Sequence, residues 1–292
     1  MRWSRGRGAG QVEDRRGRGG GRGGGLAIGG GVGGMGLIGL IVVVLLNGLG
    51  GGGGSGFDIG PGLDNFGQTG EQQGGVPPES DDAAQFVQFT VADVQDTWAQ
   101  LFDAAGREYA PTTLVLFERG TSTGCGSATS AVGPFYCPAD RKVYIDLSFF
   151  DELRSRFGAP GDFAQAYVIA HEFGHHVQNL LGVNEDVRRQ QQQNPDDANE
   201  LSVLLELQAD CFAGVWAFSA NERAILDPGD VEEGLTAAAS VGDDRLQQQA
   251  GGRVDEESFT HGTSEQRSTW FRRGFDSGDP GECDTFSEGA DG

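Results

Sequence analysis

Apolar residues recur at helical spacing over several long segments of the C-terminal two thirds of the chain. In residues 81–105, large apolar side chains from Phe86 to Phe102 follow one another mostly at intervals of three to five, which predicts an amphipathic helix. The same criterion predicts further helices over residues 161–181, 201–219, 232–249 and 264–275. Gly182 is a suitable C-cap, and Thr263 with Gln266 has the capping-box spacing ahead of the last helix. Residues 188–197 are so polar that we expect a solvated loop or a frayed helix.

Three shorter segments are rich in β-branched and aromatic residues, which predicts strands over residues 112–118, 133–137 and 142–150. The turn Pro138–Arg141 joins the last two. Helices therefore predominate around one small antiparallel sheet, and the fold class is α+β. By fold analogy, the strand at residues 142–147 is a candidate sheet edge along which an extended peptide could align through main-chain hydrogen bonds.

A different pattern occupies residues 26–49, where an uncharged, glycine-rich and apolar stretch approaches the ~20 residues that a membrane helix needs. A cleaved signal peptide is one alternative, but no small-x-small cleavage site follows near Asn47. A flexible spacer is another, and it does not explain the sequence LIGLIVVVLL. We expect one N-terminal transmembrane helix, an uncleaved single-pass anchor. Its arginine-rich side would be cytoplasmic and the C-terminal domain extracytoplasmic.

Charge divides the chain in the same way. Residues 1–25 carry seven arginines against Glu13 and Asp14, while the whole chain has a net charge of −22, so the rest carries −27. We expect a disordered basic cytoplasmic tail over residues 1–25, a Gly/Pro/Gln linker over 50–80, one domain over 81–285 and a disordered tail over 286–292. The acidity of that domain argues against nucleic acid as a partner. The sequence does not indicate an oligomeric state.

Four cysteines, Cys125, Cys137, Cys211 and Cys283, all lie in the predicted domain. An even number beyond a membrane anchor favours two disulfides, with Cys125–Cys137 as the local pair and Cys211–Cys283 as the long-range pair. Four free buried thiols are the alternative. No C-x-x-C spacing occurs, which disfavours a cysteine zinc site.

Three of the four histidines stand in the sequence HEFGHH at residues 171–176. Residues four apart share one face of a helix, so His171 and His175 can hold one metal ion between them. Glu172 can then reach a metal-bound water as general base. Gly174 gives a neighbouring element room to approach this helix closely. His176 points about 100° away, so we expect it to be structural or exposed.

A catalytic zinc site needs a third protein ligand, and the next apolar helix offers one. Glu206 and Asp210 are four residues apart on an otherwise apolar helix, where lone acids are costly unless they are paired or bind metal. We predict Glu206 as the third ligand and Asp210 as the acceptor that fixes a zinc histidine. An acid pair satisfied by arginine is the alternative. A third histidine six residues beyond His175 is absent, since Leu181 stands there.

Together, AHEFGHHVQNLLG and ELQADCFAGVW resemble the YpfJ-like neutral zinc metallopeptidase family, among the zincins that combine H-E-x-x-H with E-x-x-x-D. The resemblance extends over most of residues 85–285. It implies a zincin-like domain with one catalytic Zn²⁺ held by His171, His175 and Glu206, and with Glu172 as the catalytic residue. It implies no particular substrate.

We therefore predict a membrane-anchored zinc peptidase that hydrolyses peptide bonds in a peptide or protein substrate by a zinc-activated water. In related membrane zincins a segment similar to that around His261 lies beside the active site, so His261 is a candidate to steady the oxyanion. Capping or surface placement is the alternative for this residue. A catalytically silent, zinc-stabilised extracytoplasmic binding module is the alternative for the whole protein.

Overall fold

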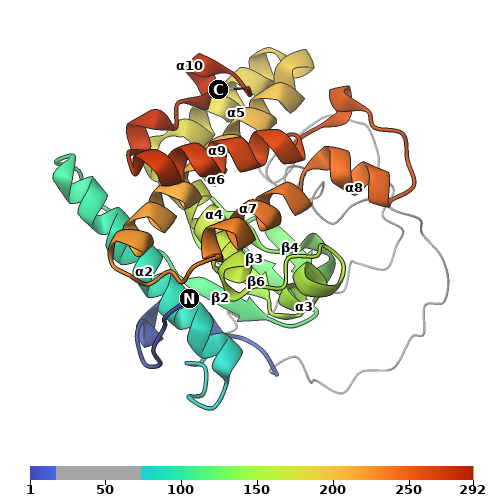
Figure 1. Cartoon of the computed structure of the whole chain (residues 1–292). Helices are drawn as coiled ribbons and strands as arrows, with labels where there is room; N and C mark the ends of the chain where they lie inside the picture. The colour runs from blue at the N-terminus through green and yellow to red at the C-terminus, as the bar shows by residue number, and fades with distance from the viewer. Residues whose placement is uncertain (18–73, 292) are drawn as a thin grey trace.

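The computed structural model describes residues 1–17 and 74–291. At its centre, the long buried helices α4 (Asp162–Leu181) and α6 (Ala198–Glu222) pack against each other (Figure 1). Helix α9 (Ser264–Ser277) packs along α6 because glycines face the contact. A Cβ at Gly274 would lie 2.0 Å from the Cys211 carbonyl oxygen, and one at Gly214 would lie 2.1 Å from that of Phe271. The backbones of α6 and α9 therefore approach closely along their length.

Other helices surround this central group. Helix α2 (Asp82–Ala104) lies along one side, and shorter helices cover the ends (Figure 1). Their bounds are α3 (Ser148–Ser155), α5 (Val183–Gln193), α7 (Asp230–Ser240), α8 (Asp243–Gln249) and α10 (Thr285–Glu288). The protein is mainly helical with a small sheet, as expected. The predicted Gly182 cap and the Thr263–Gln266 capping box are both confirmed.

The main sheet has the strand order β1-β2-β6-β5. Its strands are β1 (Val12–Asp14), β2 (Leu114–Phe117), β5 (Phe135–Cys137) and β6 (Lys142–Asp146). The expectation of an antiparallel sheet was wrong, because β1–β2 and β2–β6 are parallel and only β5–β6 is antiparallel. The connection from β2 to β6 contains the hairpin of β3 (Gly120–Thr123) and β4 (Gly126–Thr129), which gives the chain the length that a parallel pairing needs.

Both faces of this sheet are covered. Leu114, Leu116, Val143 and Ile145 point into the large core under the helices, whereas Val115, Phe117 and Tyr144 belong to a second cluster on the hairpin side. This alternation follows from the two-residue period of a strand. A register slip of one residue would exchange the two sets, so the register is strongly specified.

The strand expected to form an edge of the sheet is internal. Strand β6 lies between β2 and β5 and is not an edge, while β5 is the last strand of the sheet. Residues 148–150, expected to continue the strand, begin α3 instead. Asp146 ends β6 because its carboxylate accepts hydrogen bonds from the backbone N–H groups of Ser148 and Arg119.

Residues 1–17, expected within a disordered tail, lie against the domain beside α2 (Figure 1). They add strand β1 to the sheet and bury Val12. A sequence of glycine and arginine without periodicity gives no sign of this, since Arg2, Arg7 and Arg16 each pair with a carboxylate far along the chain. The expected anchor over residues 26–49 and most of the linker over 50–80 lie outside the described residues.

Residues 188–193 belong to the helix α5, so the helical one of the two forms expected for this polar segment is present, and residues 195–197 form a 3₁₀ turn. Two other expectations differ from the structure. The helix predicted over residues 232–249 is interrupted at Val241 and Gly242. The expected C-terminal tail begins within α10, and the Trp270 indole donates a hydrogen bond of 2.9 Å to the Ala290 carbonyl oxygen. In the described part of the chain, one helical stretch, Pro195–Glu222, is long and apolar enough to cross a membrane, and it is largely buried.

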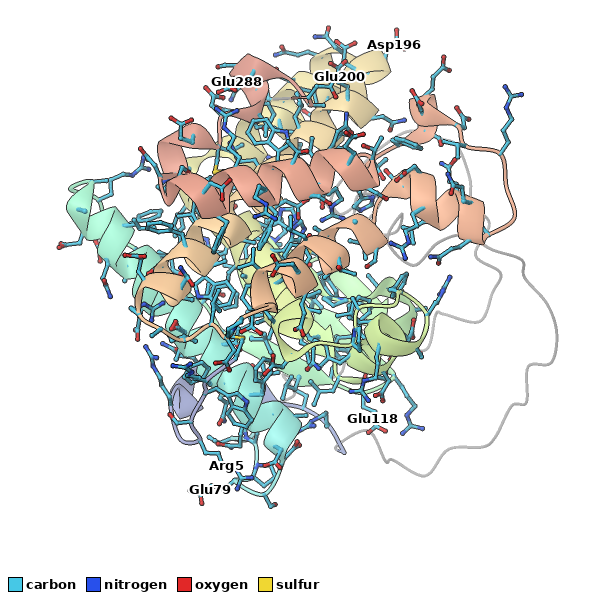
Figure 2. All side chains as sticks on the ribbon, viewed as in Figure 1. Arg5, Glu79, Glu118, Asp196, Glu200 and Glu288 are labelled. Atoms are coloured by element: carbon cyan, nitrogen blue, oxygen red, sulfur yellow. A yellow bond between two sulfur atoms is a disulfide. The ribbon has the colours of Figure 1, made fainter. Side chains whose placement is uncertain are left out.

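Both predicted disulfides are present, Cys125–Cys137 and Cys211–Cys283. The first joins the β3–β4 hairpin to strand β5, and the second joins α6 to the C-terminal segment. Charged side chains such as Glu79, Asp196 and Glu288 project from widely separated parts of the surface (Figure 2). This distribution agrees with the acidic composition of the domain.

Candidate metal centre

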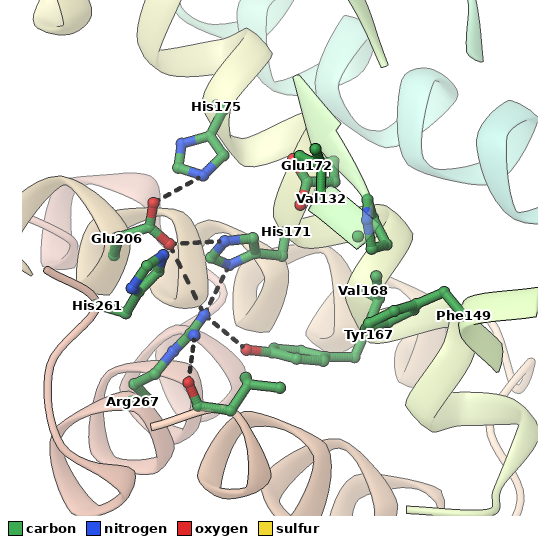
Figure 3. A pocket seen from close by; sticks show the side chains of 13 residues that line it. Val132, Phe149, Tyr167, Val168, His171, Glu172, His175, Glu206, His261 and Arg267 are labelled. Atoms are coloured by element: carbon green, nitrogen blue, oxygen red, sulfur yellow. Dashed lines mark hydrogen bonds and ion pairs between the residues drawn. The ribbon is translucent and has the colours of Figure 1, made fainter. Parts of the chain in front are cut away.

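Two histidines of α4 and one glutamate of α6 converge in the interior (Figure 3). The Nε2 atom of His171 lies 3.1 Å from Oε2 of Glu206, and Nε2 of His175 lies 3.4 Å from Oε1 of the same carboxylate. One ligand atom from each residue falls within 4.8 Å of the others, and all three side chains are buried. The structure therefore brings the three predicted ligands together.

The close approach of α4 and α6 depends on Gly174. A Cβ at this position would lie 3.0 Å from the Ala209 carbonyl oxygen and 3.1 Å from the Ala209 Cα. A larger side chain would push the helix that carries Glu206 away from the helix that carries both histidines. The role predicted for Gly174 is confirmed by this contact.

Asp210 stands one turn after Glu206 and holds His171 from behind. Its Oδ1 lies 2.8 Å from Nδ1 of His171, and the Tyr167 hydroxyl donates to the same oxygen. Arg267, from α9, donates from Nε to Oδ2 over 2.7 Å and from Nη2 to Oδ1 over 3.0 Å. The two acids therefore differ. Asp210 pairs with an arginine, as the alternative interpretation of the acid pair stated, whereas Glu206 faces the two histidines as predicted for a metal ligand. Nη2 of Arg267 is 4.0 Å from Glu206.

A second buried network holds His175. Its Nδ1 lies 2.8 Å from Oε1 of Gln178, and the Gln178 amide nitrogen donates to the Leu205 carbonyl oxygen over 2.6 Å. Both histidines are therefore fixed through Nδ1, which leaves Nε2 of each directed at Glu206. Sequence reasoning missed these supporting residues. Tyr167 and Gln178 could have been found, because they lie four before His171 and three after His175 on one helix. Arg267 lies in the segment after His261 that is similar to one beside the active site of related membrane zincins, but its pairing with Asp210 was not predicted.

A pocket opens beside this cluster. Its polar wall contains His171, Glu172, His175, Glu206 and His261, and its apolar wall contains Val132, Pro134, Phe149 and Val168. Figure 3 shows Glu172 near Val132, and His261 next to Glu206. Oε2 of Glu172 and Nε2 of His261 are buried, and neither has a hydrogen-bond partner within the described residues. Two unsatisfied polar atoms in one pocket indicate a place for a ligand, a metal or an ordered water.

His261 is held in place by Asp243 at the start of α8. The Asp243 Oδ2 accepts the His261 backbone N–H over 2.7 Å, and Oδ1 lies 3.3 Å from Nδ1 of the ring. Surface placement is excluded, since the side chain is 1% exposed. The cap of α9 is Thr263 and not His261. Asp243 is a further residue that sequence reasoning missed.

Comparison with known proteins shows the family to which the chain belongs. The profile of the family described as "Putative neutral zinc metallopeptidase" matches residues 1–286. The chain belongs to this family. It is 49% identical over 292 residues to the uncharacterized protein YpfJ of Escherichia coli K12, covering 99% of both chains. It is 45% identical over 221 residues to the uncharacterized protein Rv2575 of Mycobacterium tuberculosis H37Rv, covering 70% of this chain and 73% of the relative. No solved structure matches significantly.

The family name implies zinc, and the donor set fits that metal. Two imidazole nitrogens and one carboxylate oxygen are a ligand combination that catalytic zinc sites use, with a further position left for water or substrate. The supporting hydrogen bonds from Asp210 and Gln178 complete such a site. In this member of the family, the residues that would hold Zn²⁺ are His171, His175 and Glu206.

Charges around the three ligands reinforce one another. Burial lowers the pKa of His171, but the carboxylates of Asp210 and Glu206 outweigh it and raise the pKa to about 10. Burial raises the pKa of Glu206, but the His175 and His261 rings outweigh it and hold that pKa well below its usual range. The surroundings therefore favour the ionised carboxylate of Glu206, which is the form that binds a metal ion.

Glu172 differs from Glu206 in its surroundings. Burial is the main cause that raises the pKa of Glu172 above the ordinary glutamate value, although His175 and His171 oppose it. A carboxylate with a raised pKa accepts a proton more readily, which suits a general base.

His176 takes no part in the centre. Its Nδ1 lies 3.1 Å from the Tyr136 hydroxyl and its Nε2 lies 2.7 Å from the Ala110 carbonyl oxygen. The residue is buried, so of the two expected placements the structural one holds. Burial lowers the pKa of this imidazole, which favours the neutral ring.

Proposed function

We propose that this protein is a zinc-dependent metallopeptidase that hydrolyses peptide bonds with Glu172 as general base. One observation carries the proposal. Oε2 of Glu172 is buried in the pocket without a hydrogen-bond partner in the described chain, next to three side chains that suit a single zinc ion. A buried carboxylate oxygen of this kind is costly to maintain, so its persistence points to a chemical role.

Zn²⁺ bound to the three ligands would supply a Lewis acid and a water of lowered pKa. Glu172 accepts a proton from the attacking water at Oε2 and later delivers it to the leaving amine. Asp210 and Gln178 hold the two histidines so that each Nε2 stays directed at the shared position. The buried walls of the pocket exclude bulk water and strengthen these electrostatic interactions.

His261 faces the same pocket and is suited to stabilise the negative oxygen that develops on the carbonyl. Its Nδ1 lies 3.0 Å from the Thr260 hydroxyl and 3.3 Å from the Asp243 carboxylate, and its Nε2 faces the pocket without a partner among the described residues. A donor placed where charge develops lowers the barrier more than one that binds the substrate alone.

A peptide suits this pocket better than a small polar substrate. The apolar wall of Val132, Pro134, Phe149 and Val168 offers a site for an apolar side chain. Strand β5 follows directly after Pro134, and it is the last strand of the main sheet. An extended peptide could add to this edge by main-chain hydrogen bonds, with one side chain in the pocket.

The proposal includes attachment to a membrane through residues 26–49, with the peptidase domain outside the cytoplasm. Two disulfides within the domain support this placement, because such bonds persist in oxidising compartments.

Replacing Glu172 by Gln tests the proposal. The full-length chain, purified in mild detergent, is incubated with a broad peptide library, and bound zinc is measured by elemental mass spectrometry. We expect Glu172→Gln to keep its zinc and to lose about 10²–10⁴-fold in turnover. Glu185→Gln, an exposed position on α5, is the matched control and should behave as the parent.

Two outcomes contradict the proposal. A parent chain with one zinc per molecule that cleaves no peptide would favour the silent binding module. Full activity in Glu172→Gln would remove the assignment of the general base while leaving the zinc ligands in place.

A further inference from the structure

The α-amino group of Met1 is bound by carboxylates of the domain. It lies 3.0 Å from Oδ2 of Asp162, 3.2 Å from Oδ2 of Asp230 and 3.7 Å from Oδ2 of Asp227. Asp162 begins α4 and Asp230 begins α7, and the amino group itself is inaccessible to solvent. The chain end thus neutralises a cluster of carboxylates at two helix N-termini, at a place distant in sequence from residue 1.

The residues that follow continue this contact. The Arg2 backbone N–H donates to the Ile225 carbonyl oxygen over 2.7 Å, and the Arg2 guanidinium pairs with Asp227 at 2.8 Å. The Trp3 ring meets Phe86 edge-on at 5.6 Å between centroids. Arg7 pairs with Asp96 on α2 at 2.6 Å. Basic side chains of the N-terminal segment thus pair with acids of the domain.

Strand β1 then joins the sheet. Val12, Glu13 and Asp14 pair in parallel with Leu114, Val115 and Leu116 of β2, respectively. The Val12 side chain is 3% exposed and belongs to the large core, and the Glu13 carboxylate receives the Lys142 ammonium at 3.0 Å. Lys142 is the single lysine of the chain. A core residue and main-chain pairing distinguish this segment from a loosely associated tail.

The two described flanks of residues 18–73 are bonded to each other. The Asp14 N–H donates to the Gly75 carbonyl oxygen over 2.7 Å, and the Gly75 N–H donates to the Asp14 carbonyl oxygen over 2.9 Å. Arg16 reaches Asp81, the N-cap of α2, at 2.7 Å. Chain segments on either side of the apolar stretch therefore meet at hydrogen-bonding distance.

From these contacts we infer that residues 1–17 are a structural part of the peptidase domain, docked through arginine–carboxylate ion pairs and a parallel strand. We further infer that the N-terminus lies on the same side of the membrane as the metal centre. A single crossing would separate residues 14 and 75 by a hydrocarbon core about 30 Å thick, which their hydrogen bonds do not permit. This differs from the expected topology, with a cytoplasmic N-terminus and an extracytoplasmic domain.

Docking is tested by hydrogen exchange of the full-length chain in mild detergent, read by mass spectrometry. Amides of residues 12–15 should exchange slowly, at rates comparable to those of β2, because they are paired in a sheet that includes core residues. Exchange of this segment as fast as that of an unstructured peptide would overturn the docking.

Sidedness is tested with single cysteines and a membrane-impermeant maleimide. All four native cysteines lie in the described residues and are paired in disulfides, so the maleimide should react with the added cysteine. Ser4→Cys lies on the N-terminal segment and Ser155→Cys on the domain, both at exposed positions. In intact cells and in inverted vesicles, we expect both to react from the same side. Reaction from opposite sides would overturn the inference. Neither measurement involves hydrolysis, so their outcome is independent of the proposed peptidase activity.

Discussion

Arg267 and Asp210 form a two-point ion pair in the interior of the protein, with Nε–Oδ2 and Nη2–Oδ1 distances of 2.7 and 3.0 Å. Asp210 is 0% exposed and Arg267 is 3% exposed. Asp210 also accepts from His171, so the pair links α9 and α6 to the metal-binding helix. Burying either charge alone would cost much free energy of hydration, and the ion pair with its hydrogen bonds offsets that cost.

Removal of Arg267 is expected to be strongly destabilising. Arg267→Met leaves the Asp210 carboxylate buried without its partner, and the free energy of unfolding should fall by about 3–5 kcal/mol, measured by urea denaturation. The control is Arg273→Met on the same helix, where the ion pairs with Glu282 and Glu288 are at the surface. That change should cost about 0–1 kcal/mol. Equal losses for the two variants would contradict a special role for the buried pair.

His261 is expected to act on turnover and not on zinc binding. His261→Gln removes the donor proposed for the developing oxyanion, so kcat should fall about 10²–10³-fold while KM and zinc content change little. Asp243→Asn should lower kcat in the same direction and less severely, because the imidazole remains. Steady-state kinetics on one peptide of the library provides the measurement. A change confined to KM would assign His261 to substrate binding alone.

Sequence patterns predicted the parts of this protein that depend on neighbours in the chain. The spacing of His171 and His175, the caps at Gly182 and Thr263, and the acid pair on α6 all follow from helix geometry, and the structure brings these groups to their expected places. The disulfide partners could also be predicted, because four cysteines allow only three ways of pairing.

What sequence reasoning missed depends on contacts between distant segments. Arg267 reaches Asp210 from 57 residues away, and Arg7 reaches Asp96 from 89 residues away. In neither case does the sequence near the arginine indicate which carboxylate it pairs with. Strand β1 is only three residues long, and it is a strand because β2 offers an unpaired edge. Such pairings arise from tertiary structure and leave no periodic signal.

Gly174→Ala should destabilise the protein, although this exchange ordinarily stabilises an exposed helix by about 0.5–1 kcal/mol. The added methyl would meet the backbone of Ala209 at 3.0–3.1 Å. Overpacking of this kind costs about 1–3 kcal/mol, and the shift of α6 should also weaken zinc binding. Urea denaturation and competition with a chromogenic chelator measure the two effects. A stabilised variant with unchanged zinc affinity would show that the contact between α4 and α6 accommodates a methyl group at position 174.

The docked amino group makes stability depend on alkaline pH. Burial lowers the pKa of the Met1 amine, but Asp162 and Asp230 outweigh it and raise the pKa above its ordinary value of 8.0. A group whose pKa is raised on folding contributes stability that is complete below its unfolded pKa and is lost as the pH rises through its folded pKa. Asp227 and Glu233 are the other acids near this amino group.

A Met-Gly-Ser extension ahead of Met1 removes this ammonium from its place. The melting temperature of the native chain should exceed that of the extended chain at about pH 7, and the difference should shrink by about pH 10. Taking the difference cancels titrations that both chains share. A difference that stays constant over this range would show that the amino group contributes nothing by its charge.

The disulfide between Cys125 and Cys137 has a consequence for self-digestion. Val132, Gly133 and Pro134 line the pocket, and they lie within the 12-residue separation that this bond closes into a covalent ring. If another copy of the chain has the proposed activity and cuts the ring once, the two new ends remain joined through the disulfide. The nicked molecule keeps its mass on a non-reducing gel apart from one added water, and two fragments separate only after reduction.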